Sequence, residues 1–343
     1  MASRDTMRIA QVMAGAPKGG AELFYERLTI ALAAAGETVL PVVRANAERE
    51  GRLRAGGVAP VGLGFGGPLD LRTRWRLRQT LRSFRPDVTV AWMNRAAGAT
   101  PAGDWVLVGR QGGFYDLKYY RHCDHIVGNT MGIVAWLVEQ GWPAHRAHYV
   151  PNFVPDMQPG EASAPRDGQA PVLLTMGRLH RNKAFDTLIR ALPMIPDAVL
   201  RIAGEGPERD ALASLAADLG VVDRVQLLGW RHDTAALLAE ADLLVCPSRH
   251  EPLGNVVIEG WSARRPVVAA SSQGPAELIE HGRTGLLVPV DDPPALAAAI
   301  RDALAEPLRS VLAAAGRLRY ETEFTESAVV ERWRRFLRSA EKA

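Results

Sequence analysis

The sequence is poor in the residues that stabilise small secreted domains. Its 343 residues include only two cysteines, Cys123 and Cys246, which lie far apart in the chain. Two cysteines cannot form a disulfide framework, and their spacing matches no metal site, so the pattern favours a reducing compartment. No run approaches the roughly 20 apolar residues that span a bilayer, and the N-terminus lacks the apolar core of a secretory signal. We therefore expect a cytoplasmic protein.

Aromatic residues are also scarce, at 6% of the chain. We see no basic groove with interleaved stacking aromatic residues and no nucleic-acid-binding motif, so a nucleic-acid partner is not expected. The net charge is only +3, but it is unevenly distributed. Residues 1–160 hold 19 Lys and Arg against 13 Asp and Glu, a net +6, whereas residues 161–343 hold 22 against 25, a net −3. The basic half predicts an anionic partner, such as lipid headgroups or phosphates.

What the chain does contain is a strand–helix alternation that occurs twice. With 47% apolar and 23% charged residues it has the composition of a globular protein, and its length predicts two domains. The first alternation has strand-like segments at 7–13, 38–43, 87–92, 106–110, 125–129 and 147–152, with helix-like segments at 21–36 and 71–85. The second has strand-like segments at 171–177, 199–204, 224–229, 243–248, 266–271 and 285–290, with helix-like segments between them and a helical tail at 308–340.

Alternating strands and helices predict parallel sheets. The stretch 151–170 is rich in Pro, Gly, Ser and Ala, which is typical of a linker. We therefore predict an α/β protein of two Rossmann-like domains, 1–160 and 161–325, which face each other across a cleft. A C-terminal helix at 326–343 is expected to pack back on the first domain. Ligands of such sheets bind beyond the carboxyl ends of the strands.

The first strand-to-helix turn, MAGAPKGGAELF, carries Gly15, Gly19 and Gly20. It is not a P-loop, because Lys18 precedes the glycine pair and no Ser or Thr follows it. Two glycines at a helix start let backbone N–H groups approach a phosphate closely. The alternative is a turn that merely needs a positive φ angle.

A second candidate is GRLHRNKAFDTLI, which follows the first strand of the second domain. Arg178 and Lys183 lie in the loop after that strand. An arginine fork and a lysine point charge together suit a diphosphate. Otherwise the two residues are ordinary solvated surface cations.

The stretch RHEPLGNVVIEG places Glu251 and Glu259 on either side of Gly254 and Asn255. Gly254 and Asn255 are expected to begin a helix, whose N-terminus favours anions. Glu251 then has to face something neutral or cationic, such as sugar hydroxyls, while Glu259 falls far enough along the helix to accept hydrogen bonds from a ribose. The alternative is a helix-start charge followed by an unrelated surface glutamate.

EPLGNVVIE resembles the E-x7-E element of the retaining glycosyltransferases of family 4, which have the GT-B fold. The segments GGAELFYERLTIALAAAG, GRLHRNKAFDTLIRAL, RIAGEGPERDAL and GPAELIEHGRTGLLVPVDD resemble further segments of that family, in its order. The resemblance is dense between about residues 171 and 300 and thinner before them. It implies the transfer of a sugar from a nucleoside diphosphate to an acceptor hydroxyl, with retention of the anomeric configuration. We slightly favour UDP over GDP as the nucleotide of the donor.

The resemblance also implies a role for each matching residue. Arg178 and Lys183 would hold the donor diphosphate, and Glu251 would contact the sugar. The remaining implied donor contacts are the backbone N–H groups of Leu253, Gly254, Asn255 and Val256, the ribose contact of Glu259, the base contacts near Gly229, Trp230 and Arg231, and a diphosphate contact of Gly19 and Gly20. The leaving phosphate would act as the base, and no metal or other cofactor is expected because no DxD-type carboxylate pair follows a strand.

The sequence departs from the family in the loop after 106–110, where many relatives have a histidine near the donor sugar. This loop reads QGGFYDLKYY. Either Gln111 or the backbone takes that contact, or the reaction does not need it; His122 and His125 are more often structural in such positions. Tyr115, Asp116 and Lys118 lie where an acceptor would enter, so they bind the acceptor or the tyrosines simply pack.

Residues 72–85 place Arg74, Arg78, Arg82 and Arg85 on one helical stripe and Leu77, Leu81 and Phe84 on another. The arginines either form the solvated face of a core helix or contact an anionic membrane. Bacterial members of the family often build lipopolysaccharide or other cell-surface glycans, which implies a glycan or lipid-linked acceptor at the cytoplasmic face of the membrane. A nucleotide-sugar epimerase of the same fold and a non-catalytic nucleotide-sugar-binding protein remain alternatives.

Overall fold

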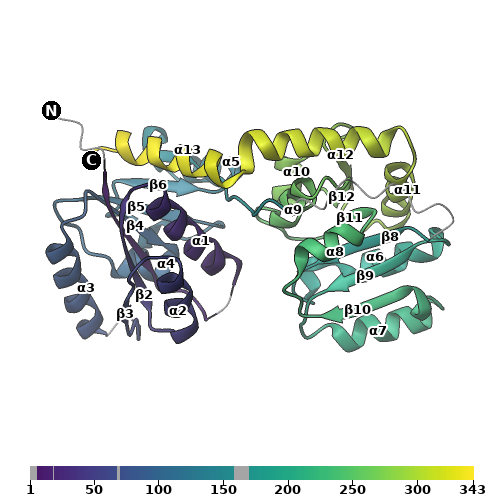
Figure 1. Cartoon of the computed structure of the whole chain (residues 1–343), viewed down its shortest axis with the longest axis horizontal. Coiled ribbons are helices and arrows are strands. Elements are labelled where there is room, and N and C mark those ends of the chain that lie inside the picture. The colour runs from purple at the N-terminus through teal and green to yellow at the C-terminus, as the bar shows by residue number, and fades with distance from the viewer. Residues whose placement is uncertain (1–5, 18, 68–69, 158–169) are drawn as a thin grey trace. The chain divides into compact units, whose positions relative to one another are not determined.

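The computed structural model describes residues 6–17, 19–67, 70–157 and 170–343. Lys18 and most of the expected linker at 151–170, including the expected boundary at 160, lie outside these residues. The chain forms two compact units, one made of Met1–Asn152 with Glu326–Ala343 and the other of Phe153–Thr325 (Figure 1). The chain thus returns to the first unit for its last helix.

The first unit is built on a seven-stranded sheet in the order β3-β2-β1-β4-β5-β6-β7. All neighbouring strands pair in parallel. The strands are β1 (Arg8–Met13), β2 (Thr38–Arg44), β3 (Val61–Leu63), β4 (Val88–Trp92), β5 (Val106–Gln111), β6 (His125–Gly128) and β7 (Ala147–Tyr149). Strands β1 and β4 are almost wholly buried, as expected for the centre of a parallel sheet that is covered on both faces.

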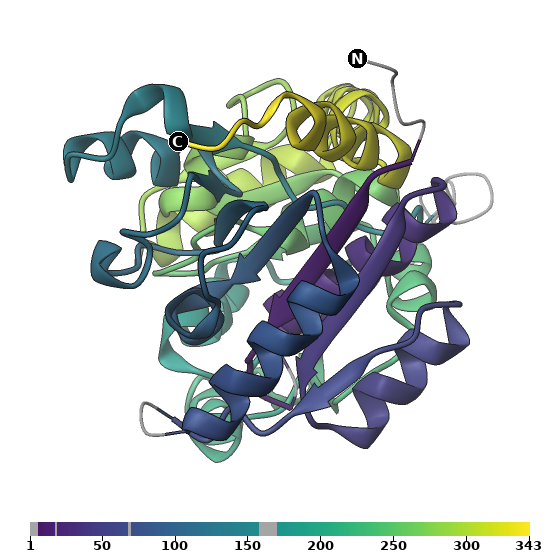
Figure 2. The ribbon, with the colours of Figure 1, turned by 90° about the vertical axis from the view of Figure 1, so that its left-hand side faces the viewer.

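The helices of the first unit are α1 (Gly20–Ala34), α2 (Ala47–Ala55), α3 (Leu71–Phe84), α4 (Met93–Ala99), α5 (Met131–Glu139) and α13 (Glu326–Ser339). Figure 2 shows the blue helix α3 in front of the purple strands of the sheet. Leu77 and Leu81 of α3 are fully buried in the core of this unit, whereas its arginines are exposed. The last helix, α13, is held by Arg334 Nε, which donates to Glu37 Oε1 at 2.8 Å.

The second unit repeats the plan with a six-stranded parallel sheet in the order β10-β9-β8-β11-β12-β13. Its strands are β8 (Val172–Met176), β9 (Val199–Ala203), β10 (Val225–Gly229), β11 (Leu243–Cys246), β12 (Val267–Ala270) and β13 (Leu286–Val288). Its helices are α6 (Phe185–Ala191), α7 (Arg209–Asp218), α8 (Thr234–Glu240), α9 (Asn255–Ser262), α10 (Gln273–Leu278), α11 (Pro293–Leu304) and α12 (Leu308–Arg319).

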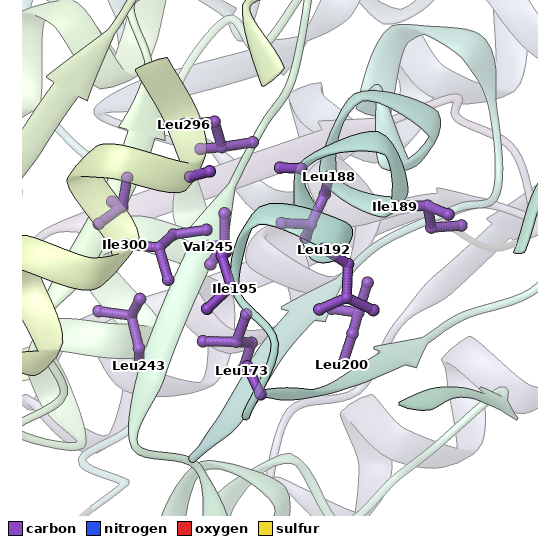
Figure 3. Packing of buried hydrophobic residues seen from close by; sticks show 14 of the residues in the cluster. Leu173, Leu188, Ile189, Leu192, Ile195, Leu200, Leu243, Val245, Leu296 and Ile300 are labelled. Carbon is purple, nitrogen blue, oxygen red and sulfur yellow. The ribbon is translucent and has the colours of Figure 1, made fainter. Parts of the chain in front are cut away.

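One face of this second sheet is covered by α6 and α11, whose leucines and isoleucines interlock with those of the strands (Figure 3). Leu188 of α6 and Ile300 of α11 are fully buried, as is Leu173 of β8. Truncating one such side chain to alanine costs about 2–5 kcal/mol of unfolding free energy. This packing makes the ends of β8 and β11 a rigid base for the loops that follow them.

The predicted α/β class, with two Rossmann-like parallel sheets, is confirmed. None of the described helices has both the length and the hydropathy of a transmembrane span.

Candidate functional site

The strand order of the second sheet places two loops at one position. β8 and β11 are neighbours in the sheet. The strand that follows β8 in the chain, β9, lies on one side of this pair, and the strand that follows β11, β12, lies on the other side. The loops after β8 and β11 therefore leave in opposite directions, and a crevice opens between their starts. The loop after β8 carries Arg178 and leads through a short 3-10 turn, Arg181–Lys183, into α6. The loop after β11 carries Glu251 and leads into α9.

Lys183 and Glu251, which are 68 residues apart in sequence, meet at this position. Lys183 Nζ donates a hydrogen bond to Glu251 Oε2. The other carboxylate oxygen, Oε1, accepts a hydrogen bond of 3.3 Å from the backbone N–H of Gly254. The side chains are 27% and 13% exposed, so the pair is accessible to a ligand but largely shielded from water. The expectation that Glu251 faces a cationic or neutral group agrees with this contact.

The electrostatics of the pair keep Lys183 charged. Burial of the ammonium by itself lowers the pKa of Lys183, but the nearby Glu251 carboxylate outweighs burial and raises the pKa above its usual value. The more weakly acting Glu259 carboxylate also raises the pKa of Lys183. An ammonium has three N–H donors and Glu251 takes one of them, so Lys183 can bind Glu251 and a further anion together.

Two glycines shape the start of α9. Gly254 is the N-cap residue, with a φ angle of 87° in the left-handed region, where a side chain is strained. Gly274 approaches the same loop so closely that a Cβ on it would lie 2.3 Å from the carbonyl carbon of Leu253. The N–H of Gly274 donates to the carbonyl of Glu251 at 2.8 Å. These contacts fix the loop that presents Glu251 to the N-terminus of α9.

Arg249 joins the loops after β8 and β11, a role that the sequence did not reveal. Its guanidinium binds Asp186 of α6 through two hydrogen bonds of 2.9 and 2.7 Å, and its Nε lies 2.6 Å from Asp291. It also donates to the carbonyl of Arg181 at 2.8 Å. Hydrogen bonds with Asp186 and Asp291 raise the pKa of Arg249, which therefore stays charged. These three contacts hold the loop that carries Lys183 and the loop that carries Glu251 in fixed positions relative to each other.

The other predicted donor-binding residues lie along the same edge of the sheet. Arg178 is exposed and makes no hydrogen bond or ion pair with any described residue. Gly229 ends β10 with a φ angle of 70°, and its carbonyl accepts a hydrogen bond of 2.8 Å from the N–H of Gly204. Trp230 is 57% exposed, while the Arg231 side chain is paired with Asp233. Leu253 is buried; Asn255, Val256 and Glu259 of α9 are half-buried.

In the first unit, the glycine turn before α1 makes room for a carboxylate of its own chain. Glu22 Oε1 accepts a hydrogen bond of 2.8 Å from the N–H of Ala16. A Cβ on Gly15 or Gly19 would lie 2.3 or 2.2 Å from the Glu22 carboxylate, so the close approach explains why glycine is found here. Gly20 begins α1 with open space around its Cα. The contact of Gly19 and Gly20 with a diphosphate stays a prediction.

Gln111, at the carboxyl end of β5, is fully buried, and neither its oxygen nor its nitrogen has a hydrogen-bond partner among the described residues. Its neighbour Arg110 is also buried, donates to Asn152 Oδ1, and lies 4.8 Å from the ring centre of Trp92. Burial lowers the pKa of Arg110 to about 10. A buried amide without partners is costly unless a ligand satisfies it.

His125 lies at the opposite edge of the sheet from Gln111. His125 opens β6 and so lies at the amino edge of the sheet, paired in register with Val108, whereas Gln111 pairs with Gly128 at the carboxyl edge. His125 Nδ1 and His148 Nε2 are 3.0 Å apart, and His125 Nε2 contacts the carbonyl of Glu341 at 2.8 Å. These contacts serve the docking of the C-terminal segment.

Of the predicted acceptor residues, Asp116 and Lys118 pair with each other at 2.7 Å and are more than half exposed. Tyr115 is half-buried against the core of the first unit, and Tyr120 is fully buried. The tyrosines therefore contribute to packing, while Asp116 and Lys118 remain on the surface. Across the described residues, no three His, Cys, Asp or Glu side chains are grouped closely enough to hold a metal ion.

Comparison with known proteins gives the family of the chain. Residues 170–306 match the family model of the group 1 glycosyl transferases. The chain is 35% identical over 332 residues to the lipopolysaccharide core biosynthesis glycosyltransferase LpsE of Rhizobium meliloti (strain 1021), which covers 94% of this chain and 96% of that protein.

Solved structures establish the fold. A glycosyltransferase from Rickettsia africae ESF-5 superposes with a TM-score of 0.87 at 16% identity, covering 98% of this chain and 99% of that one. Anabaena Alr3699/HepE in complex with UDP superposes with a TM-score of 0.82 at 21% identity, covering 97% and 100%. The same protein has also been solved with UDP-glucose, with a TM-score of 0.80 to this chain. At these identities the likeness extends to the GT-B fold and no further.

Proposed function

Because the chain belongs to the group 1 glycosyltransferases, we propose that it transfers a sugar from a nucleoside diphosphate to a hydroxyl group of a glycan or glycolipid. We further propose that the anomeric configuration is retained and that UDP is preferred over GDP. The observation that carries the proposal is the contact between Lys183 and Glu251 at the N-terminus of α9. UDP binding by the structural neighbour HepE supports the choice of nucleotide.

In the proposed mechanism, bond cleavage leaves positive charge on the sugar and negative charge on the departing diphosphate. Lys183, Arg178 and the N-terminus of α9 stabilise the departing charge, and fixed charges in a partly shielded site do so without reorganising. Glu251, which is held by Lys183 and the N–H of Gly254, orients the sugar. Glu259, one turn into α9, accepts hydrogen bonds from the ribose. These cationic groups are sufficient for the charge balance, so the proposal includes no metal.

The acceptor is proposed from the relatives and from the surface of the first unit. LpsE carries a name that assigns it to lipopolysaccharide core biosynthesis. We propose a related cell-surface glycan as the acceptor here, with Tyr115, Asp116 and Lys118 close to its entry. Gln111 takes the place of the histidine of other family members and supplies a hydrogen bond to the sugar, since its buried amide has no partner among the described residues.

A peripheral contact with the inner face of the plasma membrane completes the proposal. The exposed residues of α3 and its C-cap include six arginines, Arg72, Arg74, Arg76, Arg78, Arg82 and Arg85. The helix contains no Asp or Glu, and its Leu71 and Trp75 are 72% and 64% exposed. Arginines beside an exposed tryptophan are typical of a surface that lies on anionic headgroups.

The nucleotide specificity is tested by thermal unfolding in the presence of UDP, GDP, ADP and their sugar conjugates. A ligand at 100 times its dissociation constant adds about 2.7 kcal/mol to the unfolding free energy. We expect UDP and a UDP-sugar to stabilise the protein, the Lys183→Met variant to lose this effect, and the control Arg190→Met to keep it. A chain that no nucleotide stabilises would contradict the proposal. Donor incubated alone and returned as an isomerised sugar would identify an epimerase instead.

A further inference from the structure

The first unit contains a cavity of about 470 Å³ that none of the predicted donor contacts uses. Its wall is built from segments that follow three strands of the sheet, of which β4 and β5 are neighbours. Phe65 follows β3, Asn94 and Arg95 lie on α4 after β4, and Tyr119 lies in the short 3-10 turn Leu117–Tyr119 after β5. Arg74, from the first turns of α3, completes it. The cavity thus lies at the carboxyl edge of the sheet, where ligands of this architecture bind.

The charge of the wall favours an anion. Arg74 and Arg95 are exposed, and neither guanidinium forms an ion pair or hydrogen bond with any described residue. The wall also contains one carboxylate, Asp70, but its oxygens are occupied. They accept hydrogen bonds from the N–H of Gly66 at 2.8 Å and from the N–H and Oγ1 of Thr73 at 2.9 and 2.6 Å. These bonds lower the pKa of Asp70 to about 2. Two guanidinium groups therefore remain for a ligand.

The uncharged part of the wall suits a sugar ring. Phe65 is almost fully buried, and Tyr119 is 38% exposed. Aromatic rings of this kind bury the apolar face of a ligand. Asn94 Oδ1 is buried and accepts no hydrogen bond from any described residue, so it is available to a hydroxyl group. The cavity volume lies within the range of ordinary small-molecule sites, about 300–1,000 Å³.

We propose that this cavity binds an anionic sugar residue of the acceptor, whose phosphate or carboxylate is held by Arg74 and Arg95. A guanidinium is the side chain best suited to either group, because its planar fork offers two parallel hydrogen bonds. The inference rests on the proposed function, since it gives the acceptor of the glycosyltransferase a negative charge. It also assigns Arg74 to the cavity rather than to the arginines of α3 that are proposed to contact the membrane.

The test uses the full-length chain with the donor site saturated by UDP, and glucose 6-phosphate as the probe. Binding is measured by titration calorimetry for the wild type, for the cavity variant Arg74→Gln/Arg95→Gln, and for the control Arg78→Gln/Arg82→Gln. The control also removes two positive charges, but from residues of α3 that do not line the cavity. We expect the cavity variant to bind glucose 6-phosphate at least tenfold more weakly than the wild type, the control to bind it normally, and glucose to bind poorly to all three. Equal binding by the wild type and the cavity variant would overturn the proposal.

A second variant fills the cavity without changing its charge. Gly98 of α4 lines the cavity, and a Cβ on it would lie 3.4 Å from the ring of Tyr119. Gly98→Leu therefore projects into the space, and we expect it to abolish glucose 6-phosphate binding while thermal unfolding stays cooperative. Normal binding by a folded Gly98→Leu protein would count against the cavity.

A vesicle measurement separates a sugar anion from a lipid headgroup. On vesicles of phosphatidylglycerol and phosphatidylcholine, we expect the cavity variant to sediment like the wild type and the Arg78→Gln/Arg82→Gln control to sediment less. A cavity variant that loses vesicle binding but keeps glucose 6-phosphate binding would assign the arginines to lipid and overturn the proposal. UDP-induced stabilisation, measured on the same variants, tests the proposed function separately, because it does not depend on Arg74 or Arg95.

Discussion

Lys183 and Glu251 form an ion pair at the point where the strand order of the second sheet reverses, between β8 and β11. One comes from the loop after β8 and the other from the loop after β11, so neither loop alone makes the site. The pair also touches the N-terminus of α9 through Gly254. A lysine, a carboxylate and a helix start therefore converge at the crevice of a parallel sheet.

Arg249 is a positioning residue for this pair, and a change of its shape should weaken donor binding. Arg249→Lys keeps the charge but loses the two parallel hydrogen bonds with Asp186. We expect a loss of about 1 kcal/mol in unfolding free energy, since the ion pairs are partly exposed, and an increase in KM for the donor with a smaller change in kcat. The matched control is Arg201→Lys on β9, where Arg201 forms an ion pair with Glu240 of α8; it should leave KM unchanged.

Replacing Gln111 should lower the activity of the protein without lowering its stability. Its buried amide makes no hydrogen bond to a described residue, and such a group carries a desolvation cost of about 1–3 kcal/mol. We expect Gln111→Leu to unfold in urea at the same or a higher concentration than the wild type, and to lose at least tenfold in turnover. Thr89→Val, at a fully buried residue of β4 whose hydroxyl also has no partner among the described residues, should leave both unchanged. Full activity of Gln111→Leu would remove Gln111 from the site.

The helix α3 should carry the membrane contact. Each basic residue near an anionic surface contributes about 1 kcal/mol, so three should alter vesicle affinity by about 100-fold. We expect the Arg78/Arg82/Arg85 triple alanine variant to dissociate from phosphatidylglycerol vesicles. The matched control replaces Arg44, Arg121 and Arg190, three exposed arginines on other elements, with alanine. Equal retention of both variants on vesicles would exclude α3 as the contact.

The contact between His125 and His148 should make the first unit sensitive to acid. Burial lowers the pKa of His148 to about 4, because the charged form is desolvated and repelled by His125. The pKa of His148 in the folded state therefore lies below its unfolded value of about 6.5. The neutral His148 stabilises the folded state fully above pH 6.5, and this stability is lost as the pH falls from 6.5 through 4. We expect a loss of about 1–2 kcal/mol between pH 7 and 4, discounted because the ring is half-exposed.

The measurement for this prediction is urea unfolding at pH 7 and at pH 4.5. The His148→Phe variant keeps an aromatic ring beside Phe336, whose ring centre lies 4.5 Å away, and removes the titrating group. We expect its unfolding midpoint to fall less on acidification than that of the wild type. Identical falls would show that His148 is not responsible.

Much of the fold could be predicted because the strands are nearly continuous apolar runs between turn residues. The expected strands and most expected helices of both sheets agree with the structure to within a few residues. The helix α2 was missed because it has no apolar stripe. Only its Arg49 and Leu53 are buried, and Arg49 is held by an ion pair of 3.1 Å with Glu26 of α1. A contact of this kind leaves no periodic signal in the sequence.

The site was predictable only in part, for a similar reason. The glycine and the two carboxylates around α9 form a local pattern, and Lys183 follows a recognisable strand. Asp291 and Asp186, which bind Arg249, are 42 and 63 residues away from it in the chain. The cavity of the first unit joins segments that follow three strands. Such long-range contacts depend on the strand order, which the local sequence does not specify. Glu22 shows the converse, because a glycine turn that suggested phosphate binding holds a carboxylate of its own chain.

The most direct measurement is the rate at which nucleoside diphosphate is released from a UDP-sugar in the presence of acceptor, compared between the wild type and the Arg178→Met/Lys183→Met variant. The variant removes both cations that are proposed to stabilise the leaving group, and the loss of even one donor to a developing charge costs about 100- to 1,000-fold in rate. We expect kcat to fall at least 100-fold in a protein that still unfolds cooperatively. A rate within twofold of the wild type would contradict the proposed site.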